Sequence, residues 1–271
     1  MKNRAGDITS VVWLVAGFAF LYLPIVTLIT LSFNESPLVT TWTGFSFKWY
    51  GELVKDVPII EGFVLSIKIA LMTATASVVL GTFAAVAITK FKRFPGRTLL
   101  TGMVNSPLVM PEVIIGLSLL LMLVSVQRAT GFPDRGMLTI WLGHTLLGMA
   151  YATVVVTSRL QEMNPQLEEA GLDLGAKPWQ VFWQVVFPAI RPAMLTGLAL
   201  SFARAVGEFG SVVIISGNIP LSTLTGPVLI FQRLEEYNTV GATGIAVVML
   251  IASLITLVAI NLLQARGHDH G

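Results

Sequence analysis

The sequence predicts an all-α integral membrane protein with six transmembrane helices and a helical loop between the fourth and the fifth. Three observations predict this fold class. Apolar residues make up 54% of the chain and charged residues only 12%, and the mean hydropathy is +0.78. The apolar residues gather in stretches close to the roughly 20 residues that a helix needs to cross a bilayer. The longest polar interruption, 158–191, separates two of these stretches.

The spaces between the apolar stretches are too short for a soluble domain, so we expect a single transmembrane domain over residues 1–271. The first stretch, Val11–Leu31, is too long for the apolar core of a cleaved signal peptide. The chain has no cysteine, which excludes disulfides and thiol catalysis. The predicted spans are 9–32, 63–89, 102–126, 137–157, 193–216 and 241–263.

The distribution of basic residues predicts that both termini lie in the cytoplasm, because cytoplasmic loops are enriched in Lys and Arg. In the loop 90–97, which follows the second span, every charged residue is basic. The predicted inner segments hold Lys2, Arg4, Lys90, Lys92, Arg93, Arg97, Arg159, Lys177, Arg191 and Arg266. The predicted outer segments hold only Lys48, Lys55, Arg128, Arg135 and Arg233.

The polar loop 158–191 is predicted to form two short amphipathic helices. Apolar residues recur at three- and four-residue spacing up to Leu174, which is typical of one helix face. Gly175 is predicted to end the first helix and Pro178 to begin the second, which Pro188 is predicted to end. Amphipathic helices between membrane spans indicate a surface that docks on a partner protein.

The residue spacing in this loop resembles the EAA loop of the permease subunits of binding-protein-dependent ABC importers. That motif reads E-A-A, three residues, G, nine residues, I-x-L-P. Gly171 stands for the second Ala, Val185 for Ile and Phe187 for Leu. The residues matched to the motif's Glu, Ala, Gly and Pro positions are Glu169, Ala170, Gly171, Gly175 and Pro188.

The resemblance implies the ABC importer permease fold and a location in a bacterial cytoplasmic (inner) membrane. It implies that 158–191 is a cytoplasmic loop coupling the permease to ATPase subunits. It also implies a second permease subunit, identical or related, and an extracytoplasmic substrate-binding protein. Substrate would be delivered to the outer face, and ATP would be hydrolysed in the separate ATPase subunits.

Other stretches resemble two subfamilies of these permeases. Residues from about 18 to 185 resemble putrescine and spermidine permeases, for example at Pro107–Glu112 and Asp134–Trp141. From about 186 to 265 the chain resembles sulfate and molybdate permeases, for example at Ala203–Gly210 and Leu234–Gly241. The substrate implied is a polyamine, with sulfate, thiosulfate or molybdate as the alternative.

Three ionisable residues are predicted to lie well inside the spans: Glu112, Arg204 and Glu208. Each costs roughly 2.5–3.5 kcal/mol at mid-membrane on insertion scales, so each should face the protein interior or water. Arg204 and Glu208 are four residues apart on one helix face, where they can form an ion pair. One interpretation is that the pair only neutralises itself and fixes helix packing. The other is that it lines or gates the translocation path.

Glu112 follows Pro107 and Pro111, which are predicted to break the third span locally. Transporters place polar sites at discontinuous helices. Glu112 would suit a cationic substrate, whereas Arg204 would suit an anion. The alternative for Glu112 is a carboxylate that caps the backbone N–H groups freed by the break.

The sequence offers no pattern typical of catalysis, and we expect no catalytic residue, metal or cofactor. It lacks the spacing of a phosphate-binding loop, and His268 and His270 have no third ligand for a metal. The formal net charge of +2 does not indicate a nucleic-acid partner. An alternative from another class is an ion-coupled secondary transporter. The spans show no inverted repeat, however, and the polar loop would have no function in such a transporter. A membrane-embedded hydrolase is a more distant rival.

Overall fold

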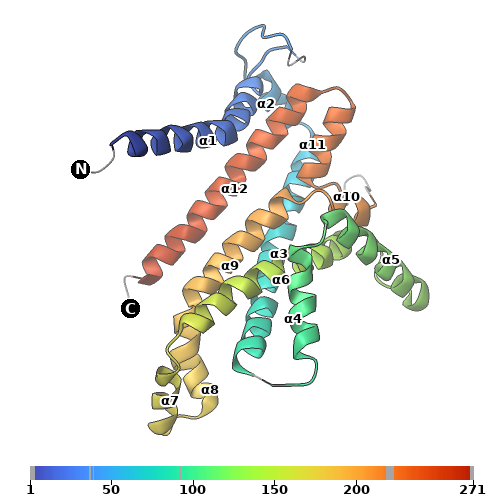
Figure 1. The fold of residues 1–271 in the computed structure, drawn as a ribbon. Coiled ribbons are helices and arrows are strands. Elements are labelled where there is room, and N and C mark those ends of the chain that lie inside the picture. The colour runs from blue at the N-terminus through green and yellow to red at the C-terminus, as the bar shows by residue number, and fades with distance from the viewer. Residues whose placement is uncertain (1–3, 37, 39, 92, 218–222, 269–271) are drawn as a thin grey trace. The chain divides into compact units, whose positions relative to one another are not determined.

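The computed structural model describes residues 4–36, 38, 40–91, 93–217 and 223–268. Its regular elements in these ranges are helices, with one isolated bridge between Asn34 and Phe45. The fold class predicted from the sequence is therefore confirmed (Figure 1). Within the described residues, six helical segments are long and apolar enough to cross a membrane: Thr9–Leu31, Val57–Lys90, Glu112–Thr130, Met137–Glu162, Pro178–Gly207 and Thr239–Leu262.

The chain divides into two compact units, one of residues 1–60 and 229–251 and the other of residues 61–228 and 252–271. Three helices run from one unit into the other: α3 (Val57–Lys90), α11 (Gly226–Glu235) and α12 (Thr239–His268). Each unit is a packed structure of its own. The single membrane domain expected from the sequence stays a prediction.

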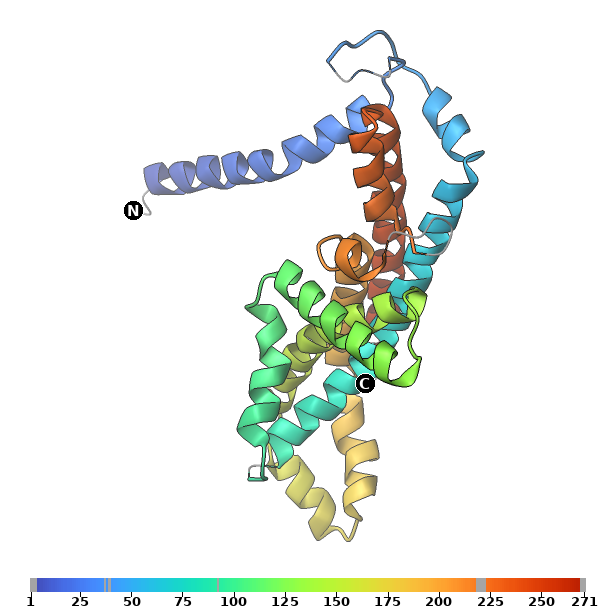
Figure 2. The same cartoon turned by 90° about the vertical axis from the view of Figure 1, so that its right-hand side faces the viewer.

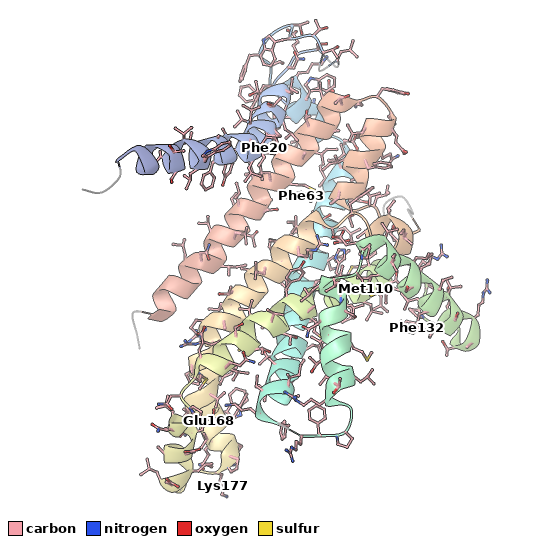
Figure 3. All side chains as sticks on the ribbon, viewed as in Figure 1. Phe20, Phe63, Met110, Phe132, Glu168 and Lys177 are labelled. Carbon is pink, nitrogen blue, oxygen red and sulfur yellow. The ribbon has the colours of Figure 1, made fainter. Side chains whose placement is uncertain are left out.

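The first unit begins with α1 (Arg4–Leu31), whose membrane-spanning window is not buried by any part of the described chain. Trp13 and Phe20 are 74% and 81% exposed (Figure 3 labels Phe20). Apolar side chains this exposed suit contact with lipid hydrocarbon or with another protein chain.

The segment after α1 is folded around a buried asparagine. Asn34 Nδ2 donates to the carbonyl oxygens of Leu38 and Thr41 at 3.1 and 2.9 Å. Trp49 of α2 (Lys48–Leu53) donates from its indole nitrogen to Asn34 O at 2.9 Å. Arg233 Nη2 of α11 lies 2.5 Å from Asp56 Oδ2, so an ion pair joins two segments predicted to be external.

The second unit is built on two long helices, α6 (Met137–Glu162) and α9 (Phe187–Gly207), which pack side by side (Figures 1 and 2). Small residues allow their backbones to approach closely, as is usual between membrane helices. A Cβ atom on Gly197 would lie only 3.2 Å from Ala152 Cα. Ser201 Oγ donates to Gly148 O at 3.0 Å and adds a polar contact to the seam.

Two buried apolar clusters support the second unit. The first lies where α3, α6 and α9 meet the polar loop, and the second lies around the start of α6. The first consists of Ala85, Val156, Leu160, Met163, Val186, Ile190 and Ala193. The second consists of Ile69, Ile140, Val212 and Val228.

The structure corrects the predicted third span, 102–126. This stretch divides into α4 (Arg97–Asn105), a 3-10 turn η1 (Ser106–Leu108) and α5 (Glu112–Thr130). Proline lacks a backbone N–H and its ring clashes with the preceding turn, so Pro107 and Pro111 end one helix and start another. The local break predicted from these prolines is confirmed. Figure 3 labels Met110 at the corner between α4 and α5.

The structure also corrects the predicted end of the second loop helix at Pro188. The helix continues from α8 (Pro178–Val181) through a π-helical turn, η2 (Phe182–Val186), into α9. The π turn shifts the hydrogen bonds to longer spacing, and Pro188 follows directly after it, at the second position of α9. The missing N–H of Pro188 thus falls at a change of register and does not end the helix.

The predicted fifth span, 193–216, ends early. Helix α9 stops at Gly207 because Glu208 is extended, with φ −70° and ψ 120°. A short helix α10 (Val212–Ile215) follows. The fifth span, like the third, is therefore interrupted.

Candidate functional site

The two interrupted spans meet at their breaks. A Cβ atom on Gly210, between α9 and α10, would lie 3.3 Å from Glu112 Oε2 at the start of α5. A Cβ atom on Gly116 of α5 would lie 2.9 Å from Ser211 Cα. Broken helices leave backbone polar groups free inside a membrane protein, and transporters use such places as substrate sites.

Arg204 joins the two breaks through its guanidinium group. Its Nη2 atom forms an ion pair with Glu112 Oε1 and lies 3.1 Å from Glu208 Oε2. The predicted pair of Arg204 with Glu208 is confirmed. The pair with Glu112, 92 residues away, was not predicted. The sequence did contain an indication of this pair, because an acidic residue inside a membrane span requires a basic partner.

Glu208 holds the break after α9 in place. Its side chain is 1% exposed. Its Oε1 atom accepts hydrogen bonds from Ser211 N at 3.1 Å and Ser211 Oγ at 2.8 Å. Side chains that bond to nearby backbone N–H groups compete with helix continuation. Glu208 is thus part of the bend itself, and its second oxygen faces Arg204.

Glu112 is the accessible member of this charged cluster. It is the first residue of α5, where the positive end of the helix dipole favours a carboxylate. Its side chain is 41% exposed and that of Arg204 is 30% exposed. With the three groups ionised, two carboxylates and one guanidinium leave a formal charge of one negative. The cluster is therefore suited to attract a cation.

The polar loop forms a helical hairpin between the C-terminal end of α6 and the N-terminal end of α9 (Figure 1). Helix α7 (Gln166–Asp173) is terminated by a turn at Gly175, whose φ is +84°. Hydrogen bonds from Gly175 N to Leu172 O and from Ala176 N to Gly171 O close the turn at 2.9 and 3.1 Å. This pattern is a Schellman motif, which a glycine in the left-handed region stabilises. The helix stop predicted at Gly175 and the start at Pro178 are confirmed.

Gly171 has a packing role that the sequence did not indicate. A Cβ atom there would lie 3.2 Å from Val181 Cγ2, so glycine lets α7 approach α8 closely. Pro188 lies outside the two short helices α7 and α8, in the continuous helix described above. Glu169 and Ala170 are exposed on α7.

The hairpin presents apolar side chains at its tip. Leu174 is 89% exposed and Trp179 is 62% exposed. Exposed apolar patches of this kind mark surfaces that contact a protein partner or the membrane. Figure 3 labels Lys177 at this tip and Glu168 on α7.

The sequence did not predict an ion pair that ties the hairpin to the basic loop 90–97. Lys90, in the last turn of α3, pairs with Glu168. The pair brings two segments predicted to be cytoplasmic to the same end of the second unit. The side of the membrane on which they lie stays a prediction.

Interrupted spans around a charged cluster, and a helical hairpin between spans, are features of a multi-pass membrane permease. Residues 77–267 match the family model described as "Binding-protein-dependent transport system inner membrane component", and the chain belongs to this family. It is a permease of an ABC importer, a transport component of the inner membrane and not an enzyme. Membership in this family decides against the ion-coupled secondary transporter.

Relatives come from both subfamilies that the sequence resembles. The chain is 46% identical over 226 residues to the putrescine transport system permease protein PotI of Escherichia coli (strain K12), covering 83% of this chain and 79% of that protein. It is 34% identical over 262 residues to the sulfate transport system permease protein CysT of the same strain, covering 92% and 91%.

The fold matches solved ABC transporters. A bacterial ABC transporter involved in the import of the acidic polysaccharide alginate superimposes with a TM-score of 0.74 and 14% identity, over 97% of this chain and 94% of that chain. A bacterial alginate ABC transporter in complex with an alginate pentasaccharide-bound periplasmic protein gives a TM-score of 0.73 at 15% identity, over 97% and 93%. At these identities the likeness concerns the fold alone.

Proposed function

We propose that the chain carries a polyamine such as putrescine or spermidine across the inner membrane. The observation that carries this proposal is the charged cluster of Glu112, Arg204 and Glu208, which has more negative than positive charge and an accessible carboxylate. A diamine offers two ammonium groups to such a site. The relative with 46% identity is named as a putrescine permease, which supports the same substrate.

Sulfate or another oxyanion is the second candidate. Arg204 is a guanidinium in an interrupted span, and guanidinium groups bind oxyanions with paired hydrogen bonds. The relative that covers 92% of the chain is named as a sulfate permease. This candidate is disfavoured because the guanidinium group of Arg204 already forms ion pairs with Glu112 and Glu208.

The substrate test is uptake by the complete transporter, assembled from this chain, its second permease, the ATPase subunits and the binding protein. We expect uptake of labelled putrescine and none of labelled sulfate. A charge about 10 Å away contributes roughly 1.7 kcal/mol at an effective dielectric constant of about 20. Glu112→Gln should therefore lower putrescine uptake by roughly 15- to 20-fold, whereas Glu61→Gln, which removes a carboxylate outside the cluster, should not. Uptake of sulfate alone would refute the polyamine proposal.

The hairpin 158–191 is proposed to couple the permease to cytoplasmic ATPase subunits, with its exposed apolar tip inserted into a groove of the ATPase. Transport additionally requires a second permease subunit and an extracytoplasmic binding protein. Coupling requires that docking of the hairpin differ in free energy between the inward- and outward-open states. In this arrangement both termini of the chain lie in the cytoplasm.

Two substitutions test the coupling role of the hairpin. Gly175→Val forces a β-branched residue to a φ of +84°, which changes the angle between α7 and α8. Glu169→Lys reverses an exposed charge on α7. Neither touches the core of a span, so we expect normal amounts of protein in the membrane, with loss of transport and loss of substrate-stimulated ATP hydrolysis. Wild-type transport and ATPase co-purification in both variants would contradict the coupling role.

A further inference from the structure

Helix α7 is weakly anchored for an element that is proposed to transmit movement. None of its residues is buried. It is joined to α6 through Met163, which is extended with a ψ of 135°, and to α8 through the turn at Gly175. The close approach that Gly171 permits is to Val181 of α8, within the hairpin itself. Rotation of α7 about its two ends would absorb a push on the hairpin tip.

The ion pair of Lys90 with Glu168 opposes this rotation from outside the hairpin. Glu168 lies on α7 and Lys90 on α3, a helix that is not adjacent to the hairpin in the chain. Five residues before Lys90, Ala85 of α3 packs in the buried cluster with Leu160 and Met163. The end of α3 is therefore a firm support, and the ion pair is the polar link from it to α7.

The end of α3 is also held by the basic loop. Arg97, the first residue of α4, donates from Nη2 to Ile88 O at 3.2 Å, a carbonyl in the last turn of α3. A hollow of about 560 Å³, lined by Lys90, Arg97, Glu168 and Glu169 among others, lies between α3 and α7. The hollow leaves α7 room to rotate. The angle of α7 relative to α3 therefore depends on the ion pair between Lys90 and Glu168.

We propose that Lys90 and Glu168 are positioning residues for energy coupling. The pair fixes the angle of α7 on the end of α3, so that movement of the ATPase reaches the membrane helices and is not lost as rotation of α7. This inference rests on the proposed function of the hairpin as the coupling element. It assigns a role to Lys90, a residue outside the hairpin and outside the motif that the hairpin resembles.

A partly exposed pair suits this role. The side chains of Lys90 and Glu168 are 31% and 24% exposed. Pairs of this kind change an equilibrium constant by about 1.5- to 5-fold and are weakened by salt. Breaking the pair should therefore alter coupling while leaving the protein folded and assembled.

The test measures ATP hydrolysed per substrate molecule transported by the complete transporter in liposomes. The substrate is labelled putrescine, or labelled sulfate if the uptake assay selects it. We expect Lys90→Met and Glu168→Gln each to raise this ratio by about 1.5- to 5-fold. The charge-swapped double variant, Lys90→Glu with Glu168→Lys, should restore it. Arg93→Met removes a positive charge from the same basic loop and serves as the matched control, with an unchanged ratio.

A salt titration gives an independent readout. Raising the salt from about 0.1 M to about 1 M shortens the screening length from about 10 to about 3 Å. The ratio should rise in the wild type and stay level in the double variant Lys90→Met with Glu168→Gln. If the ion pair only stabilises the fold, breaking it should lower the amount of assembled transporter. The ratio of ATP hydrolysed to substrate transported by the transporter that still assembles should then stay unchanged, and that result would overturn the inference.

The outcomes separate this inference from the proposed function. If Gly175→Val uncouples the transporter and both Lys90→Met and Glu168→Gln keep the wild-type ratio, the hairpin couples but the ion pair does not position it. If Gly175→Val and Glu169→Lys also behave as wild type, the coupling role of the hairpin itself fails. A charge-swapped variant as poorly coupled as the single variants also overturns the inference.

Discussion

Removing Arg204 is expected to cost more stability than removing either of its acidic partners. Arg204→Met leaves the Glu208 carboxylate, which is 1% exposed, without its counter-charge. Breaking a buried ion pair from one side costs roughly 3–5 kcal/mol, because the remaining charge stays buried. Glu208→Gln leaves Arg204 paired with Glu112 and retains an oxygen that can accept from Ser211 N, so we expect a cost of about 1–2 kcal/mol.

Glu112→Gln removes a carboxylate that is 41% exposed, so the loss of stability should stay below about 1 kcal/mol. The decisive variant is Arg204→Met with Glu208→Gln, in which no buried charge is stranded. Its destabilisation should be smaller than the sum of the single changes by at least about 2 kcal/mol.

The assay is a double-mutant cycle on the free energy of unfolding of the purified protein in lipid bicelles. Labelled-substrate uptake is measured on the same variants. Additive losses would refute the buried ion pair, because groups that do not interact give additive changes. A double variant that is as stable as the wild type and inactive in transport assigns the pair to the translocation path. A double variant that is stable and active assigns it to helix packing.

The topology prediction is tested with single cysteines, since the chain has none of its own. Cysteines at Arg93 and Lys177 should react with an impermeant reagent only from the cytoplasmic side, and one at Glu35 only from outside; Glu35 is used because its neighbour Asn34 is buried. Labelling of Arg93 from outside would overturn the six-span orientation. Gly116→Val should destabilise the protein by about 1–3 kcal/mol in thermal unfolding, because a Cβ atom there lies 2.9 Å from the Ser211 backbone. Gly102→Ala, whose Cβ atom meets nothing within 4 Å, is the control and should be neutral or stabilising; equal effects of the two changes would contradict the close contact of α5 with the break before α10.

Features that depend on residues close together in the sequence could be predicted from the sequence alone. Hydropathy over roughly 20 residues predicts a membrane helix, because lipid forces each spanning segment to satisfy its own backbone hydrogen bonds. The stop at Gly175 was predictable because only glycine adopts a positive φ cheaply. The spacing from Glu169 to Pro188 likewise indicated the hairpin and its family.

Other features were decided by packing between segments far apart in the chain. Glu112 and Arg204 were expected to favour opposite substrates, yet they form one ion pair because the breaks of two spans meet. The helix runs through Pro188 because a π turn precedes it. It ends at Gly207 because the carboxylate of the next residue, Glu208, bonds to Ser211. In a low-dielectric interior an ionised side chain requires a partner of opposite charge. The sequence shows that such a partner is needed, but it does not show which residue it is. Which acid meets which base depends on where glycines such as Gly116 let helices approach, and only the tertiary structure decides that.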